Sequence, residues 1–226
     1  MLGSSSRLLA ARSLIRRGCG SRAASMAASP SLQLVPCDAQ PQYAFGPWPI
    51  GAGEVFARSE TAYAFVNLKP LVPGHVLVSP LRAARRLRDL RPEEVCGVML
   101  LAQAVADRLE RHYGAAAVTL AVQDGEAAGQ TVPHVHVHVL PRRAGDFEPN
   151  DAVYGALEEG ERGMAGGLER HTANGGGGGS GGGSGAAAAP AERLNLDVER
   201  KPRTREEMAA EAFTLRALFY DELQKQ

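Results

Sequence analysis

Three histidines stand at two-residue spacing in the segment Pro133–Pro141 (PHVHVHVLP), with valines between them. Alternate residues of a β-strand point to opposite faces of a sheet. The spacing therefore predicts one strand that presents His134, His136 and His138 on one face and sends its valines into a core. Half of the chain's six histidines stand in this segment, so a plain solvent-facing strand is the weakest interpretation.

Two chemistries suit such a strand, and the first is metal binding. Two histidines at i, i+2 can share a zinc ion, but the outer Cα atoms of the three lie ~13 Å apart at ~3.3 Å per residue. Zn–N bonds are only ~2.0 to 2.1 Å long. A metal would therefore need His75, an acid or water to complete its ligand shell, and this interpretation stays open as the less favoured one.

The second chemistry is nucleophilic catalysis, which we favour. A neutral imidazole can attack phosphorus and form a covalent intermediate. His136 is the expected nucleophile because it alone is flanked on both sides. His134 and His138 would then hydrogen-bond the charged oxygens that develop during transfer.

Segments beside the histidines offer further groups to a phosphate. The run 129–132 (GQTV) supplies exposed N–H groups and a hydroxyl, and Gln123 could reach a leaving-group oxygen. Each signal is weak alone, because a Gly-Gln-Thr segment is more often a plain turn. Asn67 and His75, taken singly, would be a strand-end cap and an ordinary strand histidine.

The remaining pattern predicts the elements that hold this strand. Strands are expected at 54–58, 61–67, 75–79 and 117–123, with the histidine strand as the fifth. A helix is expected at 91–113, with Pro92 in its first turn and Gly114 after its end. Consecutive strands with one helix between them predict an α+β fold, a five-stranded antiparallel sheet covered on one face. Thr204 and Glu207 form a capping box, which predicts a C-terminal helix over 205–223.

Composition limits the classes of partner. Residues 1–37 hold five arginines and no acid, so the rest of the chain has 20 basic against 25 acidic side chains. A domain with a net negative charge is a poor general binder of nucleic acid. Cys19, Cys37 and Cys96 form no CxxC pair, which favours a reducing intracellular compartment without a cysteine zinc site. No apolar run approaches the ~20 residues of a membrane span.

The two ends of the chain differ from its centre. The first 25 residues are rich in Arg and Ser and lack acids, as in a mitochondrial or plastid transit peptide; the alternative is a true start at Met26 and a cytoplasmic protein. We expect a transit peptide and irregular lead-in over 1–42 and a domain over 43–159. A flexible glycine-rich insert over 160–202 and a helix packing on the domain within 203–226 complete the prediction.

Taken together, PHVHVHVLPR, GQTV, VQDG, VNLKPLVPGHVLVSP and AGDF resemble the histidine triad superfamily, specifically its fragile histidine triad branch, the bis(5'-adenosyl)-triphosphatases. The resemblance covers 43–157 and 203–219. It implies the histidine triad fold, a homodimer whose sheets join, and hydrolysis of diadenosine triphosphate to AMP and ADP. It also implies an adenylyl intermediate on His136, with His134 and His138 flanking it and Gln123 helping the leaving group.

The same resemblance implies the substrate-binding positions. These are Asn67, Gln123, Gly129, Gln130, Thr131, Val132, Trp48 and His75, of which His75 supports the triad. Trp48 differs in type from the residue that the family has there, and Pro133 replaces a residue with an N–H. Tyr154 resembles a phosphorylated tyrosine of animal members.

The expected covalent step needs no cofactor, although Mg²⁺ or Mn²⁺ can accompany the polyphosphate. The expected partners are the small-molecule substrate and a second copy of the chain, without nucleic acid or membrane. Two alternatives remain. One is an adenylyl-sulfate hydrolase or nucleoside phosphoramidase that uses the same histidine. The other is a nucleotide-sensing protein whose bound complex is the signal.

Overall fold

The computed structural model describes residues 31–39, 42–173 and 202–220. The predicted transit peptide, the glycine-rich run after Ala173 and the predicted helix end beyond Tyr220 lie outside these described residues. Among the described residues, no helix is both long enough and apolar enough to cross a membrane.

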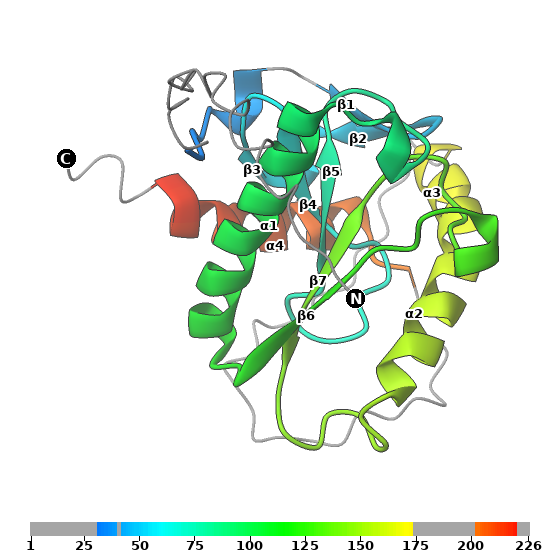
Figure 1. Ribbon diagram of the computed structural model, residues 1–226. Helices are drawn as coiled ribbons and strands as arrows, with labels where there is room; N and C mark the ends of the chain where they lie inside the picture. Colours follow the sequence, from blue (N-terminus) through cyan, green and yellow to red (C-terminus); the bar gives the residue numbers. More distant parts are fainter. Residues whose placement is uncertain (1–30, 40–41, 174–201, 221–226) are drawn as a thin grey trace, which may run out of the picture. The chain divides into compact units, whose positions relative to one another are not determined.

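A five-stranded sheet forms the centre of the fold (Figure 1). Its strands are β3 (Val55–Arg58), β4 (Ala62–Val66), β5 (Val76–Pro80), β6 (Ala117–Ala121) and β7 (Val137–Arg142). They lie in the order β3-β4-β5-β7-β6, and every neighbouring pair is antiparallel. The predicted α+β fold with a five-stranded antiparallel sheet is therefore confirmed.

Two helices pack against one face of the sheet. Helix α1 (Pro92–Tyr113) joins β5 to β6 and ends at Gly114, whose left-handed φ of 58° suits a residue without Cβ. Helix α4 (Arg205–Tyr220) starts at the predicted capping box, in which Thr204 N–H donates to Glu207 Oε2 at 2.8 Å. The buried apolar residues of both helices share one core cluster with Val137 and Val139.

The opposite face of the sheet is also covered. A hairpin of β1 (Gln42–Phe45) and β2 (Trp48–Gly51) brings Phe45 against Phe65, with ring centroids 5.0 Å apart. Helix α2 (Ala152–Arg162) contributes to a second core cluster that includes Leu140 of β7. The sheet thus lies between two layers, whereas the sequence predicted cover on one face. The hairpin strands have four residues each, too few for a clear alternation.

One predicted boundary needs correction. Residues 160–173, assigned to the flexible insert, continue α2 to Arg162 and then form α3 (Met164–Ala173). Met164 and Leu168 bury in the main core, a signal that the many glycines of this stretch conceal. The irregular lead-in also makes contacts, since Tyr43 O–H donates to the Cys37 carbonyl at 2.7 Å. Short 3-10 turns lie at Cys37–Ala39, Ala52–Glu54, Leu87–Asp89 and Glu126–Ala128.

The predicted histidine strand is shorter than expected. Strand β7 begins at Val137, so only His138 of the three histidines lies in it. Pro133 lacks an N–H, and His134 N–H donates to the Val132 carbonyl two residues back, which turns the chain. Val135 N–H bonds to the Ala84 carbonyl rather than to a sheet ladder. The chain therefore bends into the sheet at the histidines instead of running straight through them.

Candidate active site

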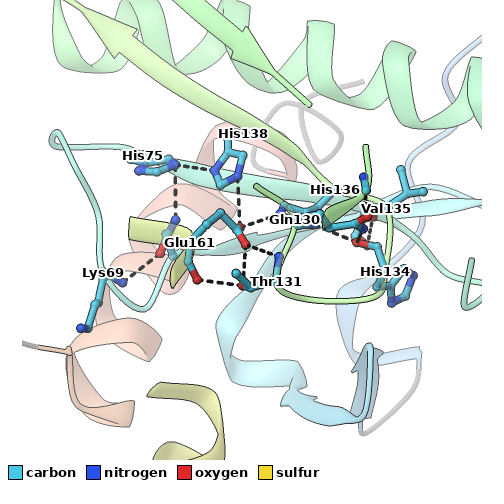
Figure 2. Close-up of polar contacts among 12 residues, drawn as sticks. Lys69, His75, Gln130, Thr131, His134, Val135, His136, His138 and Glu161 are labelled. Atoms are coloured by element: carbon cyan, nitrogen blue, oxygen red, sulfur yellow. Dashed lines mark hydrogen bonds and ion pairs between the residues drawn. The ribbon is translucent and has the colours of Figure 1, made fainter. Parts of the chain in front are cut away.

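His136 and His138 meet at one buried point, while His134 lies apart from them (Figure 2). The rings of His136 and His138 have centroids 5.0 Å apart and stand nearly edge to face. His134 stacks on Phe45 at 5.9 Å between ring centroids, and Phe45 separately meets His136 edge to face at 5.1 Å. The prediction that all three imidazoles line one site is therefore wrong for His134, because the chain turns between it and β7.

His136 has one ring nitrogen fixed and the other turned into the site. Its Nδ1 donates to the His134 carbonyl oxygen at 2.8 Å, since a carbonyl can only accept. This bond orients the ring and leaves Nε2 for chemistry. An imidazole held by its Nδ1–H is the tautomer that a nucleophilic Nε2 requires.

A chain of hydrogen bonds sets the tautomer of His138. Leu71 N–H donates to His75 Nδ1 at 3.1 Å, so the proton of a neutral His75 is on Nε2. That atom lies 3.0 Å from His138 Nδ1 and donates to it. His138 therefore presents an N–H at Nε2, and burial lowers its pKa, which keeps the ring neutral. His75 thus supports the site by orienting His138.

His134 braces the backbone. Gly46 N–H donates to its Nδ1 at 3.0 Å, and its Nε2–H donates to the Pro80 carbonyl at 3.0 Å. Both ring nitrogens are thus used away from His138. Burial lowers the pKa of His134 to about 4, in accord with a neutral ring. Its contribution to the site is its own carbonyl, which holds His136.

Glu161, at the end of α2, brings an acid into the site. Its side chain is fully buried, and Oε1 lies 2.8 Å from His136 Nε2 and 3.4 Å from His138 Nε2. Burial raises the pKa of this carboxyl, but the two histidines outweigh burial and hold it well below its usual range. The group is therefore an ionised carboxylate in contact with the expected nucleophile.

Thr131 donates to the same carboxylate. Its N–H lies 3.2 Å from Glu161 Oε2, and its hydroxyl lies 2.8 Å from that oxygen and 2.7 Å from the Glu161 carbonyl. One hydroxyl proton serves one of these two acceptors at a time. Among the groups of 129–132, the N–H and hydroxyl of Thr131 thus meet an anion, whereas the N–H groups of Gly129 and Gln130 bond to turn carbonyls.

Two other predicted residues, Asn67 and Gln123, contact groups next to the active site. Asn67 touches His75, at 3.3 Å between Nδ2 and Nε2. Gln123 packs over Gly129, where an added Cβ would lie 2.5 Å from Gln123 Nε2. Gln123 Oε1 is buried and has no hydrogen bond within the described part of the chain, so the amide has spare bonding capacity.

Three predicted positions have supporting contacts. Gln130 accepts from Gly125 N–H at 2.8 Å and donates to the carbonyls of Arg85 and His134, so its amide holds the loop. Val132 is buried in the main core, and Trp48 is half-buried against it in the β1–β2 hairpin. Gln130 thus supports the loop beside the site, whereas Val132 and Trp48 contribute to the core.

A metal interpretation can be tested on the same atoms. Ligand atoms of His136, His138 and Glu161 lie within 4.8 Å of one another. Ligands of one tetrahedral zinc at ~2.0 to 2.1 Å would stand roughly 3.3 Å apart. The 2.8 Å between His136 Nε2 and Glu161 Oε1 is instead the length of a charge-assisted hydrogen bond. We therefore treat these residues as a hydrogen-bonded group.

Sequence reasoning missed three parts of the site: Glu161, Gly46 and the Pro80 carbonyl. Glu161 is one of several glutamates in a stretch without clear periodicity, so nothing local marks it. Gly46 acts through its backbone N–H. Its φ of 60° favours glycine, so the residue type was the one signal in the sequence. All three depend on tertiary contacts.

Comparisons with known proteins show which family the sequence and fold resemble. A sequence model of the HIT domain matches residues 52–145. A bifunctional bis(5'-adenosyl)-triphosphatase/adenylylsulfatase of Arabidopsis thaliana is 44% identical, covering 78% of this chain and 84% of its own. A Schizosaccharomyces pombe protein named bis(5'-nucleosyl)-tetraphosphatase is 41% identical, covering 82% and 98%.

Solved structures extend the similarity to three dimensions. The Plasmodium falciparum diadenosine triphosphate hydrolase, in complex with cyclomarin A, gives a TM-score of 0.55 at 25% identity over 81% of this chain and 87% of that one. The Caenorhabditis elegans NitFhit protein gives 0.55 at 33% identity over 80% of this chain. The present chain spans only 31% of NitFhit. With near full-length relatives above 40% identity and the triad motif in place, the chain belongs to the histidine triad family, in its fragile histidine triad branch.

Proposed function

We propose that the protein hydrolyses dinucleoside polyphosphates, cleaving diadenosine triphosphate to AMP and ADP through an adenylyl group on His136. The observation that carries the proposal is the orientation of His136, whose Nδ1–H is bonded to the His134 carbonyl while Nε2 faces an anion-binding point. The names of the Arabidopsis thaliana and Plasmodium falciparum relatives support the substrate class.

The proposed reaction has two steps. His136 Nε2 attacks the α-phosphorus, the bond from that phosphorus to the bridging oxygen breaks, and ADP leaves. Water then attacks the same phosphorus, breaks the P–N bond and releases AMP, with net retention at phosphorus after two inversions. Nε2–H of His138 and the donors of Thr131 stabilise the negative oxygens. The amide N–H groups of Gln123, beside Gly129, are the donors that would assist the leaving group in this proposal.

Neither step requires a cofactor, and the role of Mg²⁺ or Mn²⁺ in this proposal is limited to the polyphosphate of the substrate. The charge on the transferred group is handled by the N–H and O–H donors of the protein. Activity measured in excess chelator checks this expectation, and a complete loss of turnover there would contradict it.

The covalent step predicts the behaviour of a variant without the nucleophile. His136→Asn should abolish turnover yet still bind substrate, because the amide cannot be adenylylated. His112→Asn, at an exposed position on α1, is the matched control and should retain full activity. Mass spectrometry of the native protein, quenched in base during turnover, should find the mass of an adenylyl group on the peptide with His136. Full activity of His136→Asn would contradict the mechanism.

Adenylyl sulfate is a second candidate substrate, because the Arabidopsis thaliana relative is named an adenylylsulfatase as well. The same nucleophile would displace sulfate from the α-phosphorus. A panel of diadenosine triphosphate, diadenosine tetraphosphate, adenylyl sulfate and adenosine phosphoramidate ranks these substrates by kcat/KM. Slow turnover with tight retention of every nucleotide would favour the nucleotide-sensing alternative.

We also propose that the protein is a homodimer joined along β6. This strand is the last in the sheet order, so one of its edges is unpaired among the described residues. Exposed apolar side chains gather at this edge and on α1, namely Val95, Met99, Leu120 and Val122. A second copy pairing along this edge would cover both the backbone groups and the apolar side chains.

A further inference from the structure

The acid in the active site comes from a segment outside the sheet. Glu161 stands in the last turn of α2, and α3 follows after Gly163. Its carboxylate accepts hydrogen bonds from the Thr131 N–H and from His136 Nε2. The same carboxylate lies 3.4 Å from His138 Nε2. These are the groups that the proposed reaction uses to hold and attack a phosphate. An anion supplied by the chain itself therefore occupies the place of the reacting group.

The contact also disables the nucleophile. A hydrogen bond at 2.8 Å between His136 Nε2 and a carboxylate oxygen requires one proton between the two atoms. With that proton on Nε2, the nitrogen has no lone pair with which to attack phosphorus. Glu161 thus blocks the site both by volume and by protonation of the nucleophile.

The space left beside Glu161 is too small for a nucleotide. The hollow lined by Asn67, His75, His138, Gly160 and Glu161 measures about 180 Å³, even with its open mouth included. Pockets for drug-sized ligands usually measure about 300 to 1,000 Å³. Substrate binding therefore requires α2 to move.

Helix α2 is attached lightly enough to allow such movement, whereas α3 is held in the main core by Met164 and Leu168. Helix α2 buries only Val153, Ala156, Leu157 and the Glu161 side chain, while its remaining side chains are partly or fully exposed. Segments with few buried apolar contacts open at low free-energy cost. The Glu161 carboxylate is the polar anchor of the segment in the site.

We propose that α2 is an inhibitory lid, in which the Glu161 carboxylate stands in for the α-phosphate of the substrate and must leave before the substrate can bind. The inference rests on the proposed function for the identity of the substrate. The competition between the carboxylate and a phosphate group depends only on the contacts above. A ligand with one phosphate, such as AMP, is therefore a sufficient probe.

The test compares AMP binding by the full-length wild type, Glu161→Gln and Glu159→Gln, measured by calorimetry. Glu161→Gln keeps the shape but removes the charge that competes with phosphate, so its Kd for AMP should fall about tenfold, or about 1.4 kcal/mol. Glu159→Gln makes the same charge change at an exposed position two residues away, and its Kd should not change. Unchanged or weaker AMP binding by Glu161→Gln would overturn the lid.

Hydrogen exchange of the wild type gives a second measurement that needs no variant. Saturating AMP should speed exchange of the amides in 152–162, because AMP displaces the lid. Slower or unchanged exchange there would overturn the proposal even if the Gln variant folds poorly.

A hydrolysis assay on the same samples separates the two proposals. If AMP binding tightens in Glu161→Gln but no sample cleaves diadenosine triphosphate, the lid stands and the proposed function fails. If the wild type cleaves it and Glu161→Gln loses kcat without tighter AMP binding, Glu161 assists the reaction and the lid is refuted.

Discussion

The partners of each ring distinguish the three histidines of the motif. They are alike in type and spacing, yet His134 uses both ring nitrogens on backbone groups. His136 uses only Nδ1 on backbone, and His138 uses Nδ1 on His75. A nitrogen that already donates or accepts in a buried bond is costly to remove from it. Only His136 combines an Nδ1–H held by a backbone carbonyl with an Nε2 that faces the anion-binding point, and this combination identifies the reactive position.

The buried His134 predicts a stability that depends on pH. Burial lowers its pKa to about 4 from an ordinary 6.5, so the folded protein keeps it neutral where the unfolded chain protonates it. Between pH 6.5 and 4 the unfolded state binds more protons, and the free energy of unfolding must fall as pH falls. At about 1.4 kcal/mol per pH unit, this residue accounts for a loss of about 3 kcal/mol by pH 4.

Urea denaturation between pH 7.5 and 4 checks this expectation against His134→Gln. The amide cannot titrate but can still donate to the Pro80 carbonyl. The variant should therefore lose less stability on acidification than the wild type, whatever its absolute stability at pH 7.5. Equal losses in both proteins would show that His134 does not carry the effect.

Among the elements, α4 offers a direct comparison of buried and exposed side chains on one helix. Leu215 is fully buried in the main core, whereas Phe213 is 76% exposed. Leu215→Ala should lower the free energy of unfolding by about 2 to 5 kcal/mol through lost transfer energy and a cavity. Phe213→Ala should change it by less than about 0.5 kcal/mol. Chemical denaturation measures both, and similar effects would contradict the packing of this helix.

Elements whose stability is local could be predicted from the sequence, and those fixed by tertiary contact could not. Helix α1 has its proline start, its apolar stripe and Gly114 in one continuous stretch, and the structure follows them. The histidine segment has perfect alternation, yet Pro133 and the Ala84 carbonyl bend it out of the sheet before Val137. Periodicity describes side chains, whereas the strand depends on backbone partners that lie about 50 residues away in the chain.

The candidate site likewise combines residues that the local sequence predicts with residues that only tertiary contacts bring together. The residues of the motif and its flanks could be predicted, because their types are informative and they stand close together in sequence. Glu161 could not, since its meeting with Thr131 depends on how α2 packs across Leu140 and Phe147. Resemblance to a family does not help at this position either, because Glu161 lies between the similar segments 43–157 and 203–219.

At the scale of the whole molecule, the free edge of β6 predicts a dimer that one charge can disrupt. Leu120 is 43% exposed on β6, and in a symmetric dimer each copy of a side chain near the axis meets its own equivalent. Leu120→Glu would place two carboxylates in a mostly apolar interface, where neither is paired. Light scattering after gel filtration should find the wild type as a dimer and this variant as a monomer.

The control for this prediction is Phe213→Glu, which adds the same charge at a more exposed position on α4. It should remain a dimer, because α4 contributes none of the apolar residues at the β6 edge. A wild type that is monomeric at every concentration would contradict the dimer itself. A dimeric Leu120→Glu would show that the interface lies elsewhere, because burying an unpaired charge along this strand edge is costly.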